Sequence, residues 1–203
     1  EPIVPKLVEA LKDGGSRGAA SDALSRIGKV CTTQVLPLIA DKDEALRIGV
    51  AELLGKLGDP RAVPALLRHQ DDSPAVRRVV IGALAAIAHP SAEDALLRAV
   101  SNPEDDGDAR AQAAVALGKI ASPRAVSALV RALSDEDLVL RSAAVGALSR
   151  AGRAAIPALS QAVRGTDPEV RRLAGEALGG MNDPTAVAPL AVALKDSDYR
   201  VRR

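Results

Sequence analysis

The feature that most constrains this chain is an internal repeat with a period close to 30 residues. An arginine recurs at steps of 30 to 33 residues, at Arg17, Arg47, Arg77, Arg110, Arg141, Arg171 and Arg202. Four residues before each arginine stands a residue that favours helix N-termini: Asp13, Asp43, Ser73, Asp106, Asp137, Asp167 or Asp198. A fixed period of this length is typical of stacked supersecondary units that contact mainly their neighbours. The sequence therefore predicts a solenoid.

One repeat, residues 59–88, shows what each unit contains. Asp59 is a helix N-cap and Pro60 takes the first helical position, where its missing N–H costs nothing. Ser73 and Pro74 begin a second helix in the same way. Apolar residues follow at helical spacing along that helix: Val76, Val80, Ala83, Leu84 and Ile87. Two antiparallel helices cannot bury both of their apolar stripes alone, so neighbouring units must complete the core.

We therefore expect an all-α fold, a right-handed α-solenoid of antiparallel helix pairs. The pattern predicts one continuous array over residues 1–203, with six full pairs and a truncated seventh. The expected units are 1–30, 31–58, 59–89, 90–121, 122–152, 153–182 and 183–203. The chain begins without Met and ends inside a repeat, which indicates a fragment of a longer protein. Leu117 and Leu148 are predicted to be buried in this array.

Composition narrows the functional classes. The formal net charge of +1 gives no overall field that favours nucleic acid or an acidic membrane. Phe and Trp are absent and Tyr199 is the one aromatic residue, so the core must close with small aliphatic side chains. The single cysteine, Cys31, excludes an internal disulfide and is expected to be a small buried hydrophobe. No apolar run is long enough to span a bilayer, so we expect a cytoplasmic protein. Two isolated histidines and one cysteine do not make a usual zinc site, and we expect a monomer without a cofactor or bound metal.

The pattern resembles the HEAT repeat family, in the short bacterial variety known as phycobilisome-lyase-type HEAT-like repeats. In that family a proline lies within the first helix, and an Asp and an Arg lie early in the second. Pro5, Pro64 and Pro157 share one register here, and Pro37 and Pro189 fall one residue later. The resemblance covers the whole chain. It implies a binding surface on the second helices, which line the concave side of such arrays.

The recurring Asp and Arg residues predict a structural ladder. Each Asp is placed to cap the second helix, and each Arg lies in the first turn, where a cation opposes the helix dipole. We expect each guanidinium to reach the capping carboxylate of its own or an adjacent repeat. A row of arginines that binds phosphate is the alternative.

Positions just after each ladder arginine predict which residues face outward on the second helices. The predicted partner-binding residues are Ile48, Ala51, Glu52, Arg78, Ile81, Ala114, Val115, Val145, Arg172 and Glu176. An apolar strip with a charged rim is the composition expected of a protein or peptide site. The same residues are also consistent with packing between adjacent second helices. The two interpretations predict opposite responses to a charge at Val115 or Val145.

Two further patterns are weaker. A basic stripe on the first helices comprises Arg61, Arg68, Arg98, Arg124, Arg131, Gln161, Arg164 and Lys195. It favours a solvated face over nucleic-acid binding, because stacking aromatic residues are missing. The acidic insertion at residues 102–108 lacks the EF-hand pattern and predicts an enlarged turn.

No enzyme signature stands out. His69 and His89 are isolated, and the His-Glu pairs that hold iron in the related deoxyhypusine hydroxylases are absent. We therefore expect a non-catalytic scaffold or regulatory module that binds another protein or a peptide on its concave face. The alternatives are a bilin lyase or chaperone-type subunit, and nucleic-acid binding through the convex arginines.

Overall fold

A computed structural model describes residues 3–203, and this part of the chain is all-helical. It contains fourteen α-helices joined by turns and short 3-10 helices, and no strand occurs among the described residues. The chain forms two compact units, residues 1–95 and 96–203, with the boundary inside helix α7 (Glu93–Ser101).

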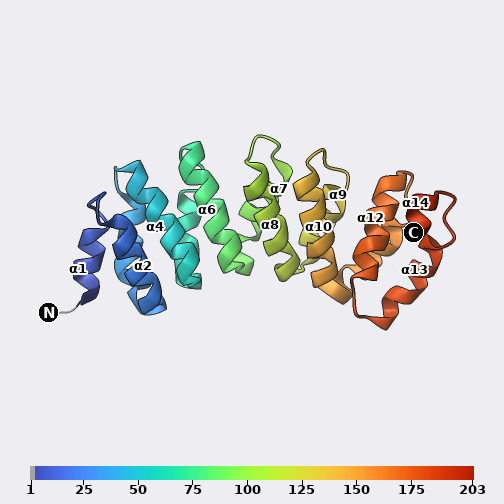
Figure 1. Ribbon diagram of the computed structural model, residues 1–203, viewed down its shortest axis with the longest axis horizontal. Helices are drawn as coiled ribbons and strands as arrows, with labels where there is room; N and C mark the ends of the chain where they lie inside the picture. Colours follow the sequence, from blue (N-terminus) through green and yellow to red (C-terminus); the bar gives the residue numbers. More distant parts are fainter. Residues whose placement is uncertain (1–2) are drawn as a thin grey trace. The chain divides into compact units, whose positions relative to one another are not determined.

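The first unit consists of helix pairs in which a short helix precedes a longer one. Its α-helices are α1 (Ile3–Ala10), α2 (Arg17–Ile27), α3 (Thr32–Val35), α4 (Glu44–Leu57), α5 (Val63–Arg68) and α6 (Pro74–Ile87). The 3-10 helices are η1 (Lys29–Cys31), η2 (Leu36–Ala40), η3 (Pro60–Ala62) and η4 (Pro90–Ala92). Even-numbered helices are the second helices of the pairs, and α2, α4 and α6 follow one another along the unit (Figure 1).

The second unit repeats the plan. After α7 its helices are α8 (Gly107–Ile120), α9 (Pro123–Ala132), α10 (Leu138–Ala151), α11 (Ile156–Ala162), α12 (Pro168–Gly179), α13 (Val187–Ala193) and α14 (Tyr199–Arg202). Two 3-10 helices, η5 (Gly152–Ala154) and η6 (Pro184–Ala186), precede α11 and α13. The second helix α10 lies between α8 and α12 (Figure 1).

The first helices begin in two ways. In α9 the helix begins directly at Pro123. At the corresponding place before α5, Pro60 opens a 3-10 turn, and the α-helix begins only at Val63, whose N–H bonds to the carbonyl of Pro60. The same 3-10 turn precedes α7 and α13.

The second helices α2, α4, α6, α8 and α10 are each followed by a residue with positive φ where the next helix pair begins. Gly28, Gly58 and Gly152 have φ values of 83°, 60° and 59°. Gly58 lies in the left-handed helical region, and Ala88 and Ala121 adopt the same region with φ of 50° and 52°. Their Cβ atoms make this conformation about 1 kcal/mol less favourable than it is for glycine.

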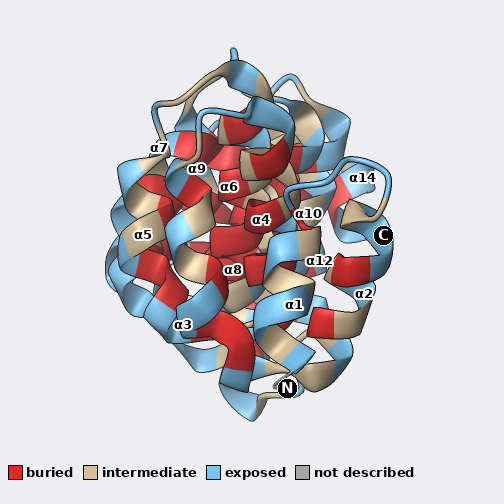
Figure 2. Cartoon of the chain, turned by 90° about the vertical axis from the view of Figure 1, so that its left-hand side faces the viewer, coloured by how far each residue is buried: buried red, intermediate tan, exposed pale blue. Residues whose placement is uncertain are grey.

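The core is built from leucine, valine and alanine at close helix separation. Leu117 and Leu148 are fully buried, which confirms that prediction, and half of the residues of α4 are buried (Figure 2). A Cβ on Gly55 would lie 2.9 Å from the Cα of Ala83 on the neighbouring second helix. Small residues at such contacts allow a dense core without aromatic side chains.

Two expectations from composition concern Cys31 and membrane spans. Cys31 is fully buried, as predicted, and burial raises the pKa of its thiol. Across residues 3–203, no helix has the length and apolar character needed to cross a membrane.

Candidate functional site

The recurring Asp and Ser residues cap the second helices. Their side-chain oxygens accept hydrogen bonds from backbone N–H groups two or three residues later, which satisfies amides that have no partner within the helix. The capping residues and donor–acceptor distances are Asp43 (2.9 Å), Ser73 (3.4 Å), Asp106 (3.2 Å), Asp137 (2.8 Å), Asp167 (2.8 Å) and Asp198 (2.9 Å).

Asp13 is the exception, and the expectation that it belongs to the same series is wrong in detail. Helix α2 begins at Arg17 with Ser16 at the N-cap position and no side-chain cap. Asp13 instead accepts hydrogen bonds from Ser16 Oγ (2.7 Å) and Gly15 N (3.4 Å). The two glycines at positions 14 and 15 disfavour helical backbone, so the helix starts three residues later than in the other repeats.

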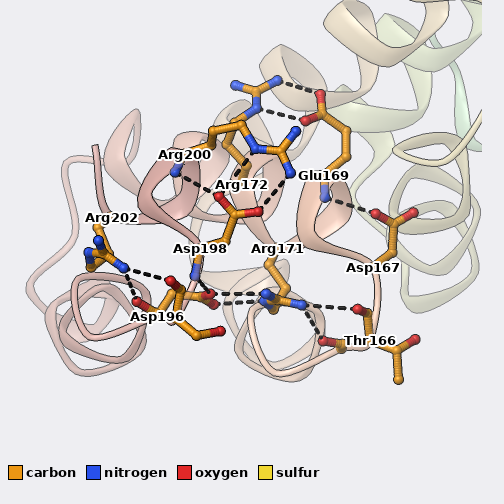
Figure 3. A network of polar contacts seen from close by, with 11 residues as sticks. Thr166, Asp167, Glu169, Arg171, Arg172, Asp196, Asp198, Arg200 and Arg202 are labelled. Atoms are coloured by element: carbon orange, nitrogen blue, oxygen red, sulfur yellow. Dashed lines mark hydrogen bonds and ion pairs between the residues drawn. The ribbon is translucent and has the colours of Figure 1, made fainter.

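The ladder arginines hold the end of the preceding first helix. Arg171 Nη1 donates to the carbonyls of Gly165 (3.1 Å) and Thr166 (3.0 Å), as Figure 3 shows in part. Arg47 and Arg202 bond in the same way to the two carbonyls five and six residues before them. Arg141 Nη1 donates to the carbonyl six residues before it, that of Asp135 (2.9 Å). These carbonyls lie at the negative end of the first helix, which explains a cation at this position.

The ion pairs of the ladder differ from the prediction. Capping carboxylates were expected as partners, and Arg17 pairs with one, Asp43, at 2.8 Å. For three other ladder arginines the acceptor is an aspartate 25 residues after the arginine, which lies in the turn before the next cap. The bidentate pairs are Arg47–Asp72, Arg110–Asp135 and Arg171–Asp196.

A physical reason favours this second carboxylate. The cap oxygen of Asp198 is turned toward its own helix, whereas Asp196 braces the turn through the N–H of Asp198 (2.8 Å) and also faces the previous pair (Figure 3). Hydrogen bonds from the Arg171 guanidinium hold the pKa of Asp196 below its usual value. The guanidinium of Arg110, itself buried, does the same for the pKa of Asp135. Arg77 is half-buried at the same register on α6.

The predicted partner-binding residues divide into two groups. Ala51, Ile81, Ala114 and Val145 are buried, so the expectation that they form an open apolar strip is wrong. They occupy the flank of each second helix that packs within the array. Glu52, Arg78 and Glu176 are exposed, and Ile48, Val115 and Arg172 are half-buried. The open surface of the second helices is therefore more polar than predicted.

Arg172 and Glu176 belong to one surface ion-pair network on α12. Arg172 pairs bidentately with Glu169, at 2.7 and 3.0 Å, and with Glu176 at 3.1 Å. The Arg172 guanidinium lowers the pKa of the Glu169 carboxyl. Exposed pairs of this kind contribute little to stability, on the order of 0.5 kcal/mol. They do orient the two side chains on the outer surface of α12.

The structure adds two exposed apolar residues that the sequence analysis missed. Leu138 and Val139 begin α10 and are 66% and 54% exposed. The signal was present, since they directly follow the cap residue Asp137, where side chains point away from the core. Together with the open residues of α8 and α10, they define the α8–α10 face: Val115, Lys119, Leu138, Val139, Ser142, Gly146 and Arg150.

The basic stripe on the first helices is exposed throughout, and one of its residues, Arg61, forms an ion pair. Arg68, Arg98, Arg124, Arg131, Gln161, Arg164 and Lys195 are all exposed. Several lie in the last turn of a first helix, where the helix dipole stabilises a cation. Arg61 is instead occupied by an ion pair with the buried Asp59 (2.6 Å).

The acidic insertion forms a turn, as predicted, with Asp106 as the cap of α8. Neither there nor elsewhere among residues 3–203 do three or more His, Cys, Asp or Glu side chains lie together so that they could hold a metal ion.

A cavity of about 580 Å³ lies in the second unit between α12, α13 and α14. Its lining includes Gly179, Leu194 and Tyr199, and the last two are well exposed. Helix α14 has four residues and covers little of α12. The cavity is therefore the uncovered flank of α12, and we assign no ligand to it.

Comparison with known proteins places these helix pairs in a family. The family model for HEAT repeats matches residues 4–72, 67–149 and 156–203. No curated protein matches the sequence.

Solved structures show the same fold at low sequence identity. The complex of CpcE and CpcF of phycocyanin lyase from Nostoc sp. PCC7120 has 18% identity and a TM-score of 0.58, over 93% of this chain and 92% of that chain. A designed armadillo repeat protein has 21% identity and a TM-score of 0.56, over 88% and 100%. An engineered protein has 22% identity and a TM-score of 0.56, over 89% and 96%. The fold is an all-helical repeat solenoid, and the chain belongs to the HEAT repeat family.

Proposed function

We propose that this chain is a non-catalytic module that binds another protein on the open face of its second helices. The observation that carries the proposal is that the polar residues of the second helices fall into two groups, those with partners inside the fold and those open to solvent. Asp and Arg residues of the ladder are engaged by helix amides, turn carbonyls and one another. Glu52, Arg78 and the α8–α10 face are left open to solvent on well-packed helices.

The engaged ladder argues against a phosphate-binding row. Arg171 uses Nε, Nη1 and Nη2 on Asp196 and on two carbonyls. A phosphate would have to displace these partly buried contacts, which are stronger than neutral hydrogen bonds. Binding on the ladder would thus compete directly with the packing of adjacent repeats.

A pre-ordered helix face suits protein recognition. Its backbone is fixed by caps and ladder contacts, so a partner loses little free energy in ordering the receptor. The open residues mix apolar side chains with both signs of charge, as in the rim and core of transient interfaces. The likeness to phycocyanin lyase extends to the fold alone at 18% identity, and its activity is no part of this proposal.

The test is an affinity capture from native lysate with three baits, followed by binding measurements on the purified partner. The baits are the unaltered chain, a face variant carrying Glu52→Lys and Arg78→Glu, and a control carrying Ser127→Glu and Gln161→Lys. The control residues are exposed on the first helices. We expect a partner that binds the unaltered chain and the control but binds the face variant at least about tenfold more weakly. A partner lost from the control and kept by the face variant would place the site on the first helices.

A further inference from the structure

Two exposed cations stand side by side on the second unit. Lys119 lies nine residues after Arg110 on α8, and Arg150 lies nine residues after Arg141 on α10, so the two are level. Adjacent Gly118 brings these helices close, since a Cβ there would lie 2.6 Å from the carbonyl oxygen of Ala147. Within residues 3–203, the side chains of Lys119 and Arg150 form no ion pair or hydrogen bond.

The helix dipole alone does not account for this arrangement. Cations are favoured in the last turn of any helix. In the first unit, however, Lys56 at the same register lies 3.9 Å from Asp22 and one turn from the exposed Glu52. On α8 and α10 the places of Asp22 and Glu52 are taken by Val115 and Gly146. Helices α8 and α10 thus keep the cations and lack the acids that would neutralise them, and the acid at this place on α12, Glu176, pairs with Arg172 instead.

The other end of α10 is apolar. Leu138 and Val139 are exposed in its first turn. A rise of 1.5 Å per residue places Leu138 about 18 Å from Arg150 along the helix. This is the length of about twelve residues of a second helix.

Between its apolar and basic ends, the exposed surface of α10 carries small residues. Ser142 and Gly146 are exposed, and a Cβ added at Gly146 would meet nothing within 4 Å. Small residues in such a position let another helix approach closely along α10. The α8–α10 face is therefore basic at one end, flat in the middle and apolar at the other end.

We propose that the α8–α10 face binds an amphipathic helix of a partner protein, oriented antiparallel to α10, with acidic residues in its N-terminal turn and bulky apolar residues toward its C-terminus. The carboxylates would meet Lys119 and Arg150, and the apolar side chains would cover Leu138 and Val139. Acidic residues are favoured at the N-terminus of the partner helix by its own dipole, so charge and orientation agree. This proposal rests on the proposed protein-binding function.

The test uses a fluorescein-labelled synthetic helix of about twelve to sixteen residues, a length set by the helical rise. Glutamates occupy its first turn and leucines its later turns on one face. A second probe has the glutamates moved to the last turn, and a third has lysines in their place. Fluorescence anisotropy on the full chain should show binding of the first probe at least about tenfold tighter than of the other two. Equal binding of all three probes would overturn the proposal.

Substitutions in this chain test which of its residues contact the probe. Lys119→Glu with Arg150→Glu should weaken the first probe at least about tenfold and make the lysine probe the tighter ligand, a rescue that a folding defect cannot produce. Val139→Asp should weaken the first probe by a similar factor. The matched control, Arg26→Glu with Lys56→Glu, alters the same register of the first unit and should change binding less than about twofold. An equal loss from the control would overturn the assignment.

Two further outcomes separate this proposal from others. A single-stranded DNA oligonucleotide that binds more tightly than the first probe and is lost with Lys119→Glu and Arg150→Glu would overturn it in favour of nucleic acid. If a captured native partner is lost from the Glu52→Lys and Arg78→Glu variant but kept by Lys119→Glu with Arg150→Glu, the proposed function stands and this inference fails. If no protein depends on either pair, the proposed function itself fails.

Discussion

Val115 on α8 and Val145 on α10 show how differently two nearby residues of one type can be placed. Val115 lies five residues after Arg110 and is half-buried, whereas Val145 lies four residues after Arg141 and is buried. One residue turns the side chain by about 100° around a helix. That step separates the open flank of the second helices from the flank packed inside the array. Small apolar residues occupy both flanks, so composition does not distinguish them.

The largest expected effect comes from placing a charge on each flank. Val145→Asp should lower the free energy of unfolding by about 4 kcal/mol or more, because it buries an unpaired carboxylate. Val115→Asp should change it by less than about 1 kcal/mol, since the new carboxylate can reach water. Chemical denaturation followed by circular dichroism measures both. Similar losses in the two variants would break the comparison.

Truncation of leucines on one helix gives the next largest difference. Leu148→Ala should cost about 3 kcal/mol, because Leu148 is fully buried and the change leaves a cavity. Leu138→Ala, at a residue 66% exposed on the same helix, should cost less than about 0.5 kcal/mol. Thermal and denaturant unfolding of the two variants provide the measurement. A small loss for Leu148→Ala would show that the burial pattern of α10 is misassigned.

Two glycines sharpen the contrast between the packed and the open flank of the second helices. Substitution by alanine should change the free energy of unfolding in opposite directions at the two positions. A Cβ at Gly118 would lie 2.7 Å from the Cα of Ala147, so Gly118→Ala should destabilise the chain by about 2 kcal/mol through forced helix separation. A Cβ at Gly146 meets nothing within 4 Å, so Gly146→Ala should stabilise α10 by about 0.5–1 kcal/mol. Denaturant midpoints decide the sign. Stabilisation by both changes would mean that α8 and α10 do not pack closely.

The free energy of unfolding should depend on pH through a buried carboxylate. Asp59 is buried, and hydrogen bonds from the Arg61 side chain lower its pKa from 3.8 to about 2. Its folded pKa is depressed, so its contribution, about 2 kcal/mol, is complete above about pH 4 and is lost as the pH falls through about 2. Unfolding free energies between pH 5 and pH 2, with Asp59→Asn alongside, measure it. An acid dependence that Asp59→Asn leaves unaltered would assign it to other carboxylates.

Much of the fold follows from local sequence. Asp137 caps α10 and Gly152 takes a positive φ after it, because both choices depend only on nearby backbone geometry. Leu117 and Leu148 could be placed in the core from the helical period alone. The capping rule failed at Asp13, where two glycines delay the helix, and the rule for a proline in the first helical turn failed at Pro60, where a 3-10 turn precedes the α-helix.

The candidate surface was less predictable. Helical spacing predicts Ala114 and Val145 to be open, and they are buried because the packed flank of each second helix lies one residue away from the phase that the spacing indicates. Leu138 and Val139 could have been found from their position after Asp137, where exposure is expected whatever the residue type.

By itself the sequence determined the helix pairs, their period, their caps and the family to which they belong. Only the tertiary structure decided which carboxylate each ladder arginine binds and which side of each second helix stays open. Arg171 could reach either Asp196 or Asp198 in sequence terms, and the choice depends on where the turn of the next pair places each oxygen. Local propensities act within a few residues, whereas these choices are made by the close packing of helices about 25 residues apart in the chain.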